Sequence, residues 1–222
     1  MRSCATWAKR WPRFGRSCEV TTTATVDLPG VQLQAGDHIC AFYRQPDERD
    51  DILIPYLLGG LAGGSKCTCV VDSCAPAHVL GRLAASVEVR SFVDDGQLEV
   101  LDSDSTYFDG GGFLPQRMLK FWASKARWSG SSESNVVRNI GDMTWAHRDK
   151  PGVADLAMYE SELNRIIGSY PQIVLCLYDL TRCDGEMVLD VLKTHPKVML
   201  GGMVIDNPYY LEPDDFLASR AR

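Results

Sequence analysis

The sequence predicts an α/β protein of three layers, in which a mostly parallel sheet carries helices on both faces. Two short apolar runs, His38–Tyr43 and Cys67–Val71, have apolar residues at helical spacing between them, which indicates a strand–helix–strand unit. The segment Ile173–Tyr178 is continuously apolar, as is typical of a central strand buried on both faces. Strand and helix patterns then alternate along the chain, which suits parallel strands joined by helical connections.

The remaining helices are predicted mainly from prolines, because proline fits the first turn of a helix. The clearest amphipathic pattern of the chain follows Pro151, where apolar residues recur on one helical face. Helices are expected to begin at Pro76, Pro115, Pro151 and Pro213, and a short one covers Glu186–Leu192.

Further strands are expected at residues 97–101, within 136–145 and at 198–205. The segment Val87–Val93 alternates weakly and could form a local hairpin with the strand that follows it. Two polar segments are read as connections, Asp102–Gly112 as an ordered loop and Ser129–Asn135 as a flexible surface link.

Charge and composition exclude several classes of protein. The net charge of −6 argues against a general role in binding nucleic acid, although residues 1–25 are basic. We expect residues 1–30 to be a disordered basic extension and residues 31–222 to form one folded domain. No apolar run approaches the roughly 20 residues of a membrane span, and the basic segment lacks the apolar stretch of an export signal.

The cysteines lie mostly inside predicted strands, where free thiols behave as small hydrophobic groups. They are Cys40, Cys67, Cys69 and Cys176. Together with the missing export signal, this predicts a cytoplasmic protein that contacts neither nucleic acid nor a membrane directly.

The connection after the first strand of the unit lacks the residues that bind phosphate. A phosphate loop needs glycines, a lysine for the terminal phosphates and a Ser or Thr for magnesium. The segment Tyr43–Asp51 has none of these, Pro46 has no N–H group, and the carboxylates would repel a triphosphate. The chain therefore combines a nucleotide-binding architecture with a degenerate phosphate loop.

Ligands of open α/β sheets bind beyond the carboxyl ends of the strands, so residues at those ends are candidate ligand contacts. An alternative is that Asp and Asn occur there only because loops need them. The candidates are Tyr43, Arg44, Trp145, Tyr178, Asp179, Asp206 and Asn207. Asp142 stands where a nucleotide hydrolase keeps a metal-binding carboxylate, but without a phosphate lysine we favour a structural or ligand-contact role.

Metal and nucleophile chemistry find little support in the sequence. His38, Cys40, Cys67, Cys69 and Cys74 lack the C-x₂-C spacing of a structural zinc site, so no metal is predicted. Redox sensing by Cys40, Cys69 and Cys176 stays open, although buried thiols are usually inert. His147 and His195 are expected at the surface in loops, and a G-x-S-x-G elbow is absent from the sequence.

Several motifs, spread in order from about Leu33 to Leu217, resemble the MEDS domain, the methanogen/methylotroph DcmR-type sensory domain. They are GDHICAFY (36–43), DERDD (47–51), KCTCVVD (66–72), GDMTWA (141–146), YESELN (159–164), LCLYD (175–179), THP (194–196) and DNPYY (206–210). Asp142 departs from the Glu found in many relatives, and the basic N-terminal segment has no counterpart.

The resemblance implies a RecA/KaiC-type core without its phosphate loop, which senses small, often hydrocarbon-like molecules and supplies no catalytic residues. It also favours Glu160 and Asn164, one helical turn apart, as rim residues of a ligand pocket. Members of the family occur alone or joined to DNA-binding, histidine-kinase or anti-sigma modules. Residues 31–222 would then be a stand-alone sensory domain that acts through such a partner protein.

We therefore favour a non-enzymatic sensor without a cofactor, whose small, partly apolar ligand lies near Tyr43, Trp145 and Tyr178 and repositions a neighbouring loop. An alternative is an enzyme that uses ATP or another phosphate substrate, with Asp142 and Asp179 on magnesium and Arg44 on phosphate. A third possibility is a ligand-free scaffold that binds proteins through 151–168 or 208–217.

Overall fold

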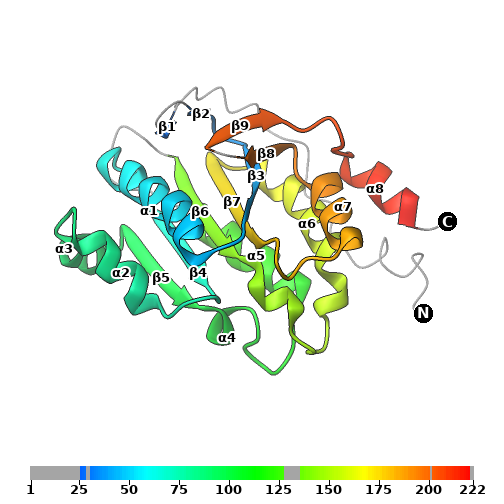
Figure 1. Cartoon of the computed structure of the whole chain (residues 1–222), viewed down its shortest axis with the longest axis horizontal. Helices are drawn as coiled ribbons and strands as arrows, with labels where there is room; N and C mark the ends of the chain where they lie inside the picture. Colours follow the sequence, from blue (N-terminus) through cyan, green and yellow to red (C-terminus); the bar gives the residue numbers. More distant parts are fainter. Residues whose placement is uncertain (1–25, 29–30, 128–135, 201, 221–222) are drawn as a thin grey trace.

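The computed structural model describes residues 26–28, 31–127, 136–200 and 202–220. A sheet of seven strands lies at its centre, in the order β5-β4-β6-β7-β3-β8-β9, and only the β8–β9 pair is antiparallel (Figure 1). The strands are β3 (His38–Tyr43), β4 (Cys67–Val71), β5 (Leu98–Asp102), β6 (Val137–Asp142), β7 (Gln172–Asp179), β8 (Lys197–Leu200) and β9 (Met203–Asp206).

Helices join most of these strands, as the alternating pattern predicted. The α-helices are α1 (Pro46–Ala62), α2 (Pro76–Ala84), α3 (Val89–Asp94), α4 (Ser103–Thr106), α5 (Pro115–Lys125), α6 (Leu156–Ile167), α7 (Gly185–Thr194) and α8 (Pro213–Arg220). Two short 3₁₀-helices, η2 (Met143–His147) and η3 (Val153–Asp155), lie between β6 and α6.

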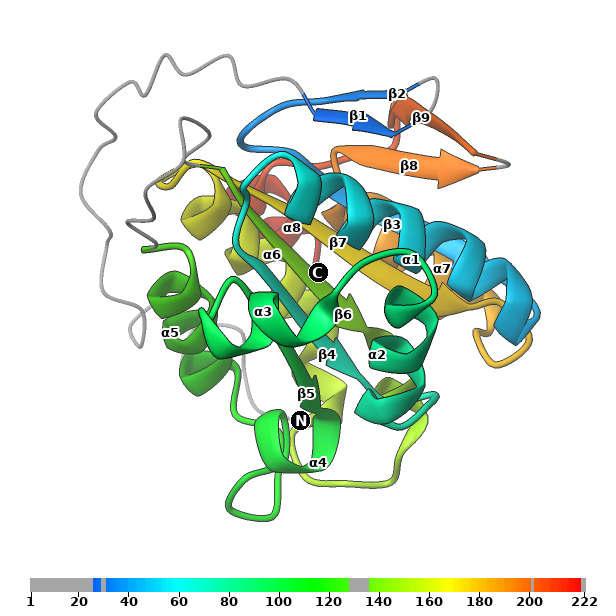
Figure 2. The ribbon, with the colours of Figure 1, turned by 90° about the vertical axis from the view of Figure 1, so that its left-hand side faces the viewer.

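The sheet separates two apolar cores. On one face α1 and α2 pack Leu53 and Val79 into a core that includes Ile39 of β3. On the other face α5, α6 and α7 contribute to a second core, which includes Trp122 and Tyr159. Figure 2 shows α1, α2 and α3 in front of the sheet and α6 behind it. The predicted three-layer α/β fold is confirmed.

Strand β7 is the central strand that its continuous apolar sequence predicted. It lies between β6 and β3, and its residues from Gln172 to Tyr178 are buried. Strand β3 pairs with β7 on one side and β8 on the other, so the two halves of the chain meet here.

The local hairpin that the sequence left possible before residue 102 is not formed. Residues 89–94 form α3, and the side chain of Glu88 accepts a hydrogen bond from the backbone N–H of Arg90 at its start. Strand β5 pairs with β4 in parallel, and parallel strands need a crossover rather than a tight turn.

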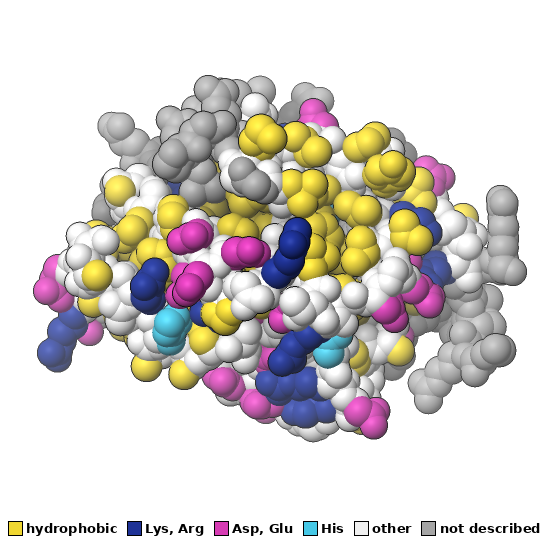
Figure 3. All heavy atoms as spheres, in the orientation of Figure 1, with side chains coloured by type: hydrophobic (Ala, Val, Ile, Leu, Met, Phe, Trp, Pro, Cys, Tyr) yellow, Lys and Arg dark blue, Asp and Glu magenta, His cyan; other side chains and the backbone are white. Residues whose placement is uncertain are grey.

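The expected single strand at 198–205 is instead a hairpin. Strands β8 and β9 pair in antiparallel register, and Gly202 adopts a left-handed conformation (φ 78°) in the turn between them. Strand β9 forms one edge of the sheet, and Met203 and Ile205 on it are exposed. Figure 3 shows hydrophobic side chains gathered over the same end of the molecule.

The helix expected from Pro151 begins later, at Leu156. Gly152 has φ 85°, and a Cβ atom at this position would lie 2.0 Å from the carbonyl oxygen of Phe113. The chain therefore makes a glycine-dependent turn and a 3₁₀ turn before α6. The predicted amphipathic character is confirmed, because α6 buries Tyr159 and Leu163 on its inner face.

The structure describes some of the predicted loops and extensions and not others. Residues 102–112 are ordered and contain α4, as the predicted ordered loop requires. Val26–Leu28, which we assigned to the basic extension, forms strand β1 and pairs with β2 (Val31–Leu33). The rest of that extension and the predicted link 129–135 lie outside the described residues.

Candidate functional site

The aromatic residues expected at the carboxyl ends of the strands lie inside the protein. Tyr43, Trp145 and Tyr178 are exposed by 3%, 0% and 1%. The ring of Trp145 stacks on Tyr107 with a centroid distance of 4.6 Å and lies equally close to Phe113. Loop 102–112 thus covers Trp145, so a ligand would reach this ring only after the loop moves.

The polar candidates at the same strand ends form hydrogen bonds with residues that are close in sequence. Arg44 is exposed, and its backbone N–H donates to Glu48 at 2.8 Å. Asp179 accepts hydrogen bonds from the backbone and hydroxyl of Thr181. Only Arg44 and Gln45 separate β3 from α1, which begins with Pro46 and two acidic residues. The degenerate phosphate loop inferred from the sequence is therefore present in the structure.

Asp142 is a buried acceptor that holds two connections together. One carboxylate oxygen accepts from the backbone N–H groups of Asp72 and Ser73, at 3.1 and 2.7 Å. The other accepts from the hydroxyl of Thr144 at 2.8 Å. Both oxygens are thus used within the protein, and the choice between the structural and the ligand-contact role that the sequence left open for Asp142 stays a prediction.

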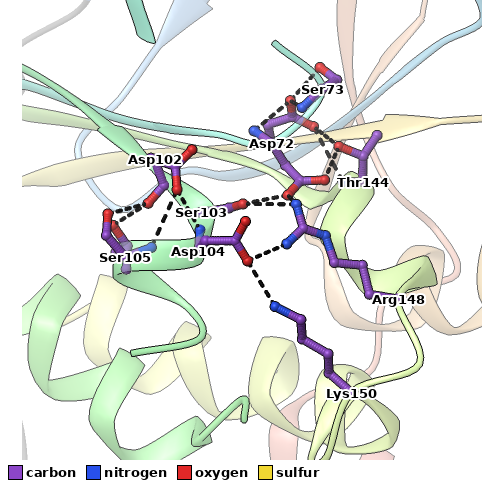
Figure 4. A network of polar contacts seen from close by, with 11 residues as sticks. Asp72, Ser73, Asp102, Ser103, Asp104, Ser105, Thr144, Arg148 and Lys150 are labelled. Atoms are coloured by element: carbon purple, nitrogen blue, oxygen red, sulfur yellow. Dashed lines mark hydrogen bonds and ion pairs between the residues drawn. The ribbon is translucent and has the colours of Figure 1, made fainter. Parts of the chain in front are cut away.

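Asp72 belongs to a network that extends this arrangement to α4 (Figure 4). Asp72 accepts from Ser103, Thr144 and Arg148, and Arg148 also contacts Asp104 at 2.6 Å. Lys150 approaches the same oxygen of Asp104 at 2.8 Å. The network ties the start of loop 102–112 to the segment after β6, which keeps the cover over Trp145 in place.

Asp206 and Asn207 do not lie at the carboxyl ends of the parallel strands. Because β9 runs antiparallel, Asp206 pairs with Lys197 at the start of β8. The amide of buried Asn207 donates to the carbonyl oxygens of Leu192 and His195, at 2.6 and 2.7 Å. These two residues therefore lie near the amino-terminal ends of the parallel strands, whereas the other five candidates lie near the carboxyl ends.

A pocket of about 300 Å³ lies between α6 and α7. Its outer part is lined by Asp184 and Glu186, which are exposed, and its inner part by Glu160, Val191 and Thr194, which are buried. Apolar side chains line much of the rest, namely Ala146, Val153, Leu156, Ala157 and Met187. On its wall, Arg220 of α8 forms an ion pair with Asp190 of α7.

Glu160, at the inner end of the pocket, also belongs to a buried cluster with His38, Cys176 and His195. The potential ligand atoms of these four residues lie within 4.8 Å of one another. Glu160 Oε2 is 3.3 Å from His38 Nε2, 3.6 Å from His195 Nε2 and 3.8 Å from Cys176 Sγ. We call these four residues the His–Glu–Cys cluster. It joins β3, β7, α6 and the end of α7.

The environment keeps two members of the cluster uncharged. Burial lowers the pKa of His195 well below its usual value, and the adjacent His38 lowers it further. Burial raises the pKa of the Cys176 thiol well above its usual value, and the nearby Glu160 adds to this rise.

Sequence reasoning missed this cluster. His195 is fully buried rather than at the surface, because Asn207 and α7 enclose it. Glu160 lies at the inner end of the pocket rather than on its rim, and half-buried Asn164 contacts His38. The available signal was the i, i+4 spacing of Glu160 and Asn164, but their partners lie on strands whose order the sequence does not specify. Within the part of the chain that the structure describes, none of the cysteines that the sequence grouped with His38 belongs to the cluster, and its thiol is that of Cys176.

The fold defines the class as a three-layer α/β protein with a mostly parallel sheet, and two solved structures share this fold. The flagellar accessory protein FlaH from Methanocaldococcus jannaschii is 12% identical with a TM-score of 0.56, covering 82% of this chain and 84% of FlaH. The uncharacterized protein PH0321 from Pyrococcus horikoshii, solved with an unknown peptide, is 16% identical with a TM-score of 0.59, covering 82% and 91%. At these identities the likeness concerns the fold alone.

The chain belongs to the MEDS family, the methanogen/methylotroph, DcmR sensory domain, whose family model matches residues 37–196. The transcriptional repressor DcmR of Methylorubrum extorquens is 30% identical over 192 residues, which are 81% of this chain and 66% of DcmR. The chain thus spans just under two thirds of that relative. A sensory or regulatory role follows from the family. In the described ranges, none of the helices is long and apolar enough to cross a membrane.

Proposed function

We propose that this chain is a non-enzymatic sensory domain that binds a small, partly apolar ligand in the pocket between α6 and α7. The observation that carries the proposal is the position of Glu160, which lines the inner end of the pocket and also contacts His38 of β3. A ligand at Glu160 would therefore act directly on the central strands.

The lining of the pocket favours one kind of ligand. Its charged groups are Glu160, Asp184, Glu186, Asp190 and Arg220, so carboxylates outnumber the single guanidinium, which is itself paired with Asp190. Such a site repels phosphate and other anions. Oxygen Oε1 of Glu160 has no hydrogen-bond partner among the described residues, and it can accept from a small amine or alcohol with an apolar body.

The proposed signal passes from the pocket to a protein partner. A ligand shifts the protein between two arrangements only by its difference in affinity for them. Two elements could take a second arrangement if their ion pairs broke. One is α8, whose Arg220 lines the pocket and pairs with Asp190, and the other is loop 102–112, whose Asp104 pairs with Arg148. The DcmR relative is a transcriptional repressor, which supports a DNA-binding or other regulatory protein as the partner. The buried free thiols suit a reducing cytoplasm.

The experiment compares ligand retention by the wild-type chain and by a variant with a filled pocket. Ala157→Leu would place additional volume in the pocket, whereas Ala84→Leu, at an exposed position of α2, serves as the matched control. Native mass spectrometry would detect a retained molecule, and propylamine, propanol and inorganic phosphate would be compared as probes by thermal shift.

We expect propylamine or propanol, but not phosphate, to stabilise the wild type and Ala84→Leu, and we expect Ala157→Leu to lose this response. Equal responses of all three proteins would place the ligand elsewhere. Retention of magnesium-ATP with conversion to ADP would replace the sensor by the enzyme alternative.

A further inference from the structure

The His–Glu–Cys cluster has the donor atoms and the spacing of a metal site. Its closest pairs are His38 Nε2 with Glu160 Oε2 at 3.3 Å, and His38 Nε2 with Cys176 Sγ at 3.5 Å. Zinc binds nitrogen and oxygen at about 2.0–2.2 Å and sulfur at about 2.3 Å, so neighbouring ligands of a tetrahedral ion lie roughly 3.3–3.6 Å apart. Glu160 Oε2 also lies 3.6 Å from His195 Nε2 and 3.8 Å from Cys176 Sγ, so four of the six ligand pairs have separations near those of such a tetrahedron, and all lie within 4.8 Å.

The hydrogen bond of His38 directs its Nε2 atom into the cluster. The amide nitrogen of Asn164 donates to the carbonyl oxygen of Thr194 at 2.8 Å, so the amide oxygen is the acceptor that faces His38. His38 Nδ1 lies 2.9 Å from that oxygen and must carry a hydrogen. Nε2 is thereby the ring nitrogen that faces Glu160 and could bind an ion there.

His195 is oriented in the same way by a backbone group. Its Nδ1 lies 2.8 Å from the carbonyl oxygen of Val191, which can only accept. Its Nε2 is buried and has no hydrogen-bond partner within the described residues. Metal-binding histidines are held in this manner, with the second ring nitrogen donating to an amide or carbonyl oxygen.

Two imidazole nitrogens and a carboxylate oxygen thus converge inside the protein, and the thiol of Cys176 completes the group. Nε2 of His195 has no hydrogen-bond partner among the described residues, and a cation held between these four groups would supply one and be attracted by the carboxylate. We propose that His38, Glu160, Cys176 and His195 bind one divalent transition-metal ion of the Zn²⁺ type. The ion displaces the proton of the Cys176 thiol, which is released to solvent, so Cys176 binds as the thiolate. The pocket that ends at Glu160 gives the ion a path of entry from solvent.

The proposed site would join segments that are distant in sequence. Its ligands come from β3, α6, β7 and the residue that follows α7, so the ion would fix the inner wall of the pocket against the sheet. This inference concerns the buried cluster itself and does not depend on whether the pocket binds an organic ligand.

The test uses the full chain, stripped with a chelator and titrated with Zn²⁺ or Co²⁺. We expect one ion per chain by native mass spectrometry, and with Co²⁺ the intense d–d bands of tetrahedral coordination and a thiolate-to-metal charge-transfer band. Cys176→Ala should abolish the charge-transfer band. Cys40→Ala is the matched control, because Cys40 is buried, pairs with Cys176 across β3 and β7, and lies outside the cluster.

Asn164→Ala tests the orientation of His38 and should weaken Co²⁺ binding by about 10–100-fold without removing the charge-transfer band. A wild-type chain that takes up neither ion, or a Co²⁺ spectrum without a thiolate band, would overturn the proposal. Since the wild-type spectrum decides this, the test holds even if Cys176→Ala does not fold. A Cys176→Ala variant that folds and keeps the band would also overturn it.

Discussion

Glu160 of α6 lies 3.3 Å from His38 of β3, and both side chains are buried. The same carboxylate lines the pocket between α6 and α7, so one side chain faces a cavity and the central sheet at once. This contact links the proposed ligand and the proposed metal ion.

Glu160→Gln would separate the effects of charge from those of shape. The amide nitrogen of Gln can donate to Nε2 of His195, which has no hydrogen-bond partner among the described residues of the wild type, so the metal-free variant should be at least as stable as the metal-free wild type. We expect Zn²⁺ to raise the Tm of the wild type clearly and that of the variant much less, because an ion that binds only the folded state stabilises it. Thermal unfolding with chelator and with Zn²⁺ measures both. An equal Zn²⁺ response of the two proteins would show that Glu160 is not a ligand.

Asp142→Asn would test the structural role of this carboxylate. The amide replaces one accepting oxygen by a donor. Two backbone hydrogen bonds are lost if the amide nitrogen faces Asp72 and Ser73, and one is lost if it faces Thr144. We expect the free energy of unfolding to fall by about 1–3 kcal/mol in urea denaturation. Asp215→Asn, at an exposed position of α8, should change it by less than about 0.5 kcal/mol. Unchanged stability of Asp142→Asn would point to a role other than structural.

Gly152→Ala would strain the turn before α6. The residue has φ 85°, and the added Cβ would lie 2.0 Å from the carbonyl oxygen of Phe113, so the backbone must shift. We expect a loss of at least about 1–3 kcal/mol in the free energy of unfolding. Gly81→Ala is the matched control, because Gly81 lies inside α2 with nothing within 4 Å of its added Cβ, and it should stabilise by about 0.5–1 kcal/mol. Equal effects would show that the turn tolerates a side chain.

Asp50 should contribute a pH-dependent part of the stability. Burial raises the pKa of Asp50, but hydrogen bonds from Arg49 and His78 lower it more, so the folded-state pKa lies below the usual 3.8. The stabilisation is therefore present above pH 3.8 and is lost as the pH falls through the folded-state pKa. Asp50→Asn should lower the Tm at neutral pH, and its difference from the wild type should shrink in acid. Exposed Asp51→Asn should show no such trend, and a constant difference for Asp50→Asn would refute the assignment.

Periodicity and turn residues were sufficient to predict most of the layered architecture. The apolar runs of β3, β4 and β7 and the helical spacing in α1 and α6 report burial directly, because one face or both faces must avoid water. The turn between β8 and β9 was missed because the two short strands and the glycine-containing turn together resemble one continuous apolar strand in the sequence. That error displaced Asp206 and Asn207 from the edge where we expected them.

The site was harder to predict than the fold. Glu160 and Asn164 were singled out by their helical spacing, but no local pattern around His195 indicated that it would be buried beside them. The contact between His38 and Cys176 depends on β3 and β7 being neighbours, and strand order is a long-range property. The aromatic residues were placed at the right strand ends, yet burial by loop 102–112 is a matter of tertiary packing.

The position of β3 also has a consequence for how the chain folds during synthesis. Its only partners in the described sheet are β7 and β8, and the contact between His38 and Cys176 spans 138 residues. Contacts of such long range form slowly, and an apolar strand that waits for its partners is prone to aggregate. Until the ribosome has translated Gln172–Asp179, β3 has neither of its partner strands. We therefore expect the yield of native protein to depend on chaperones that shield the nascent chain.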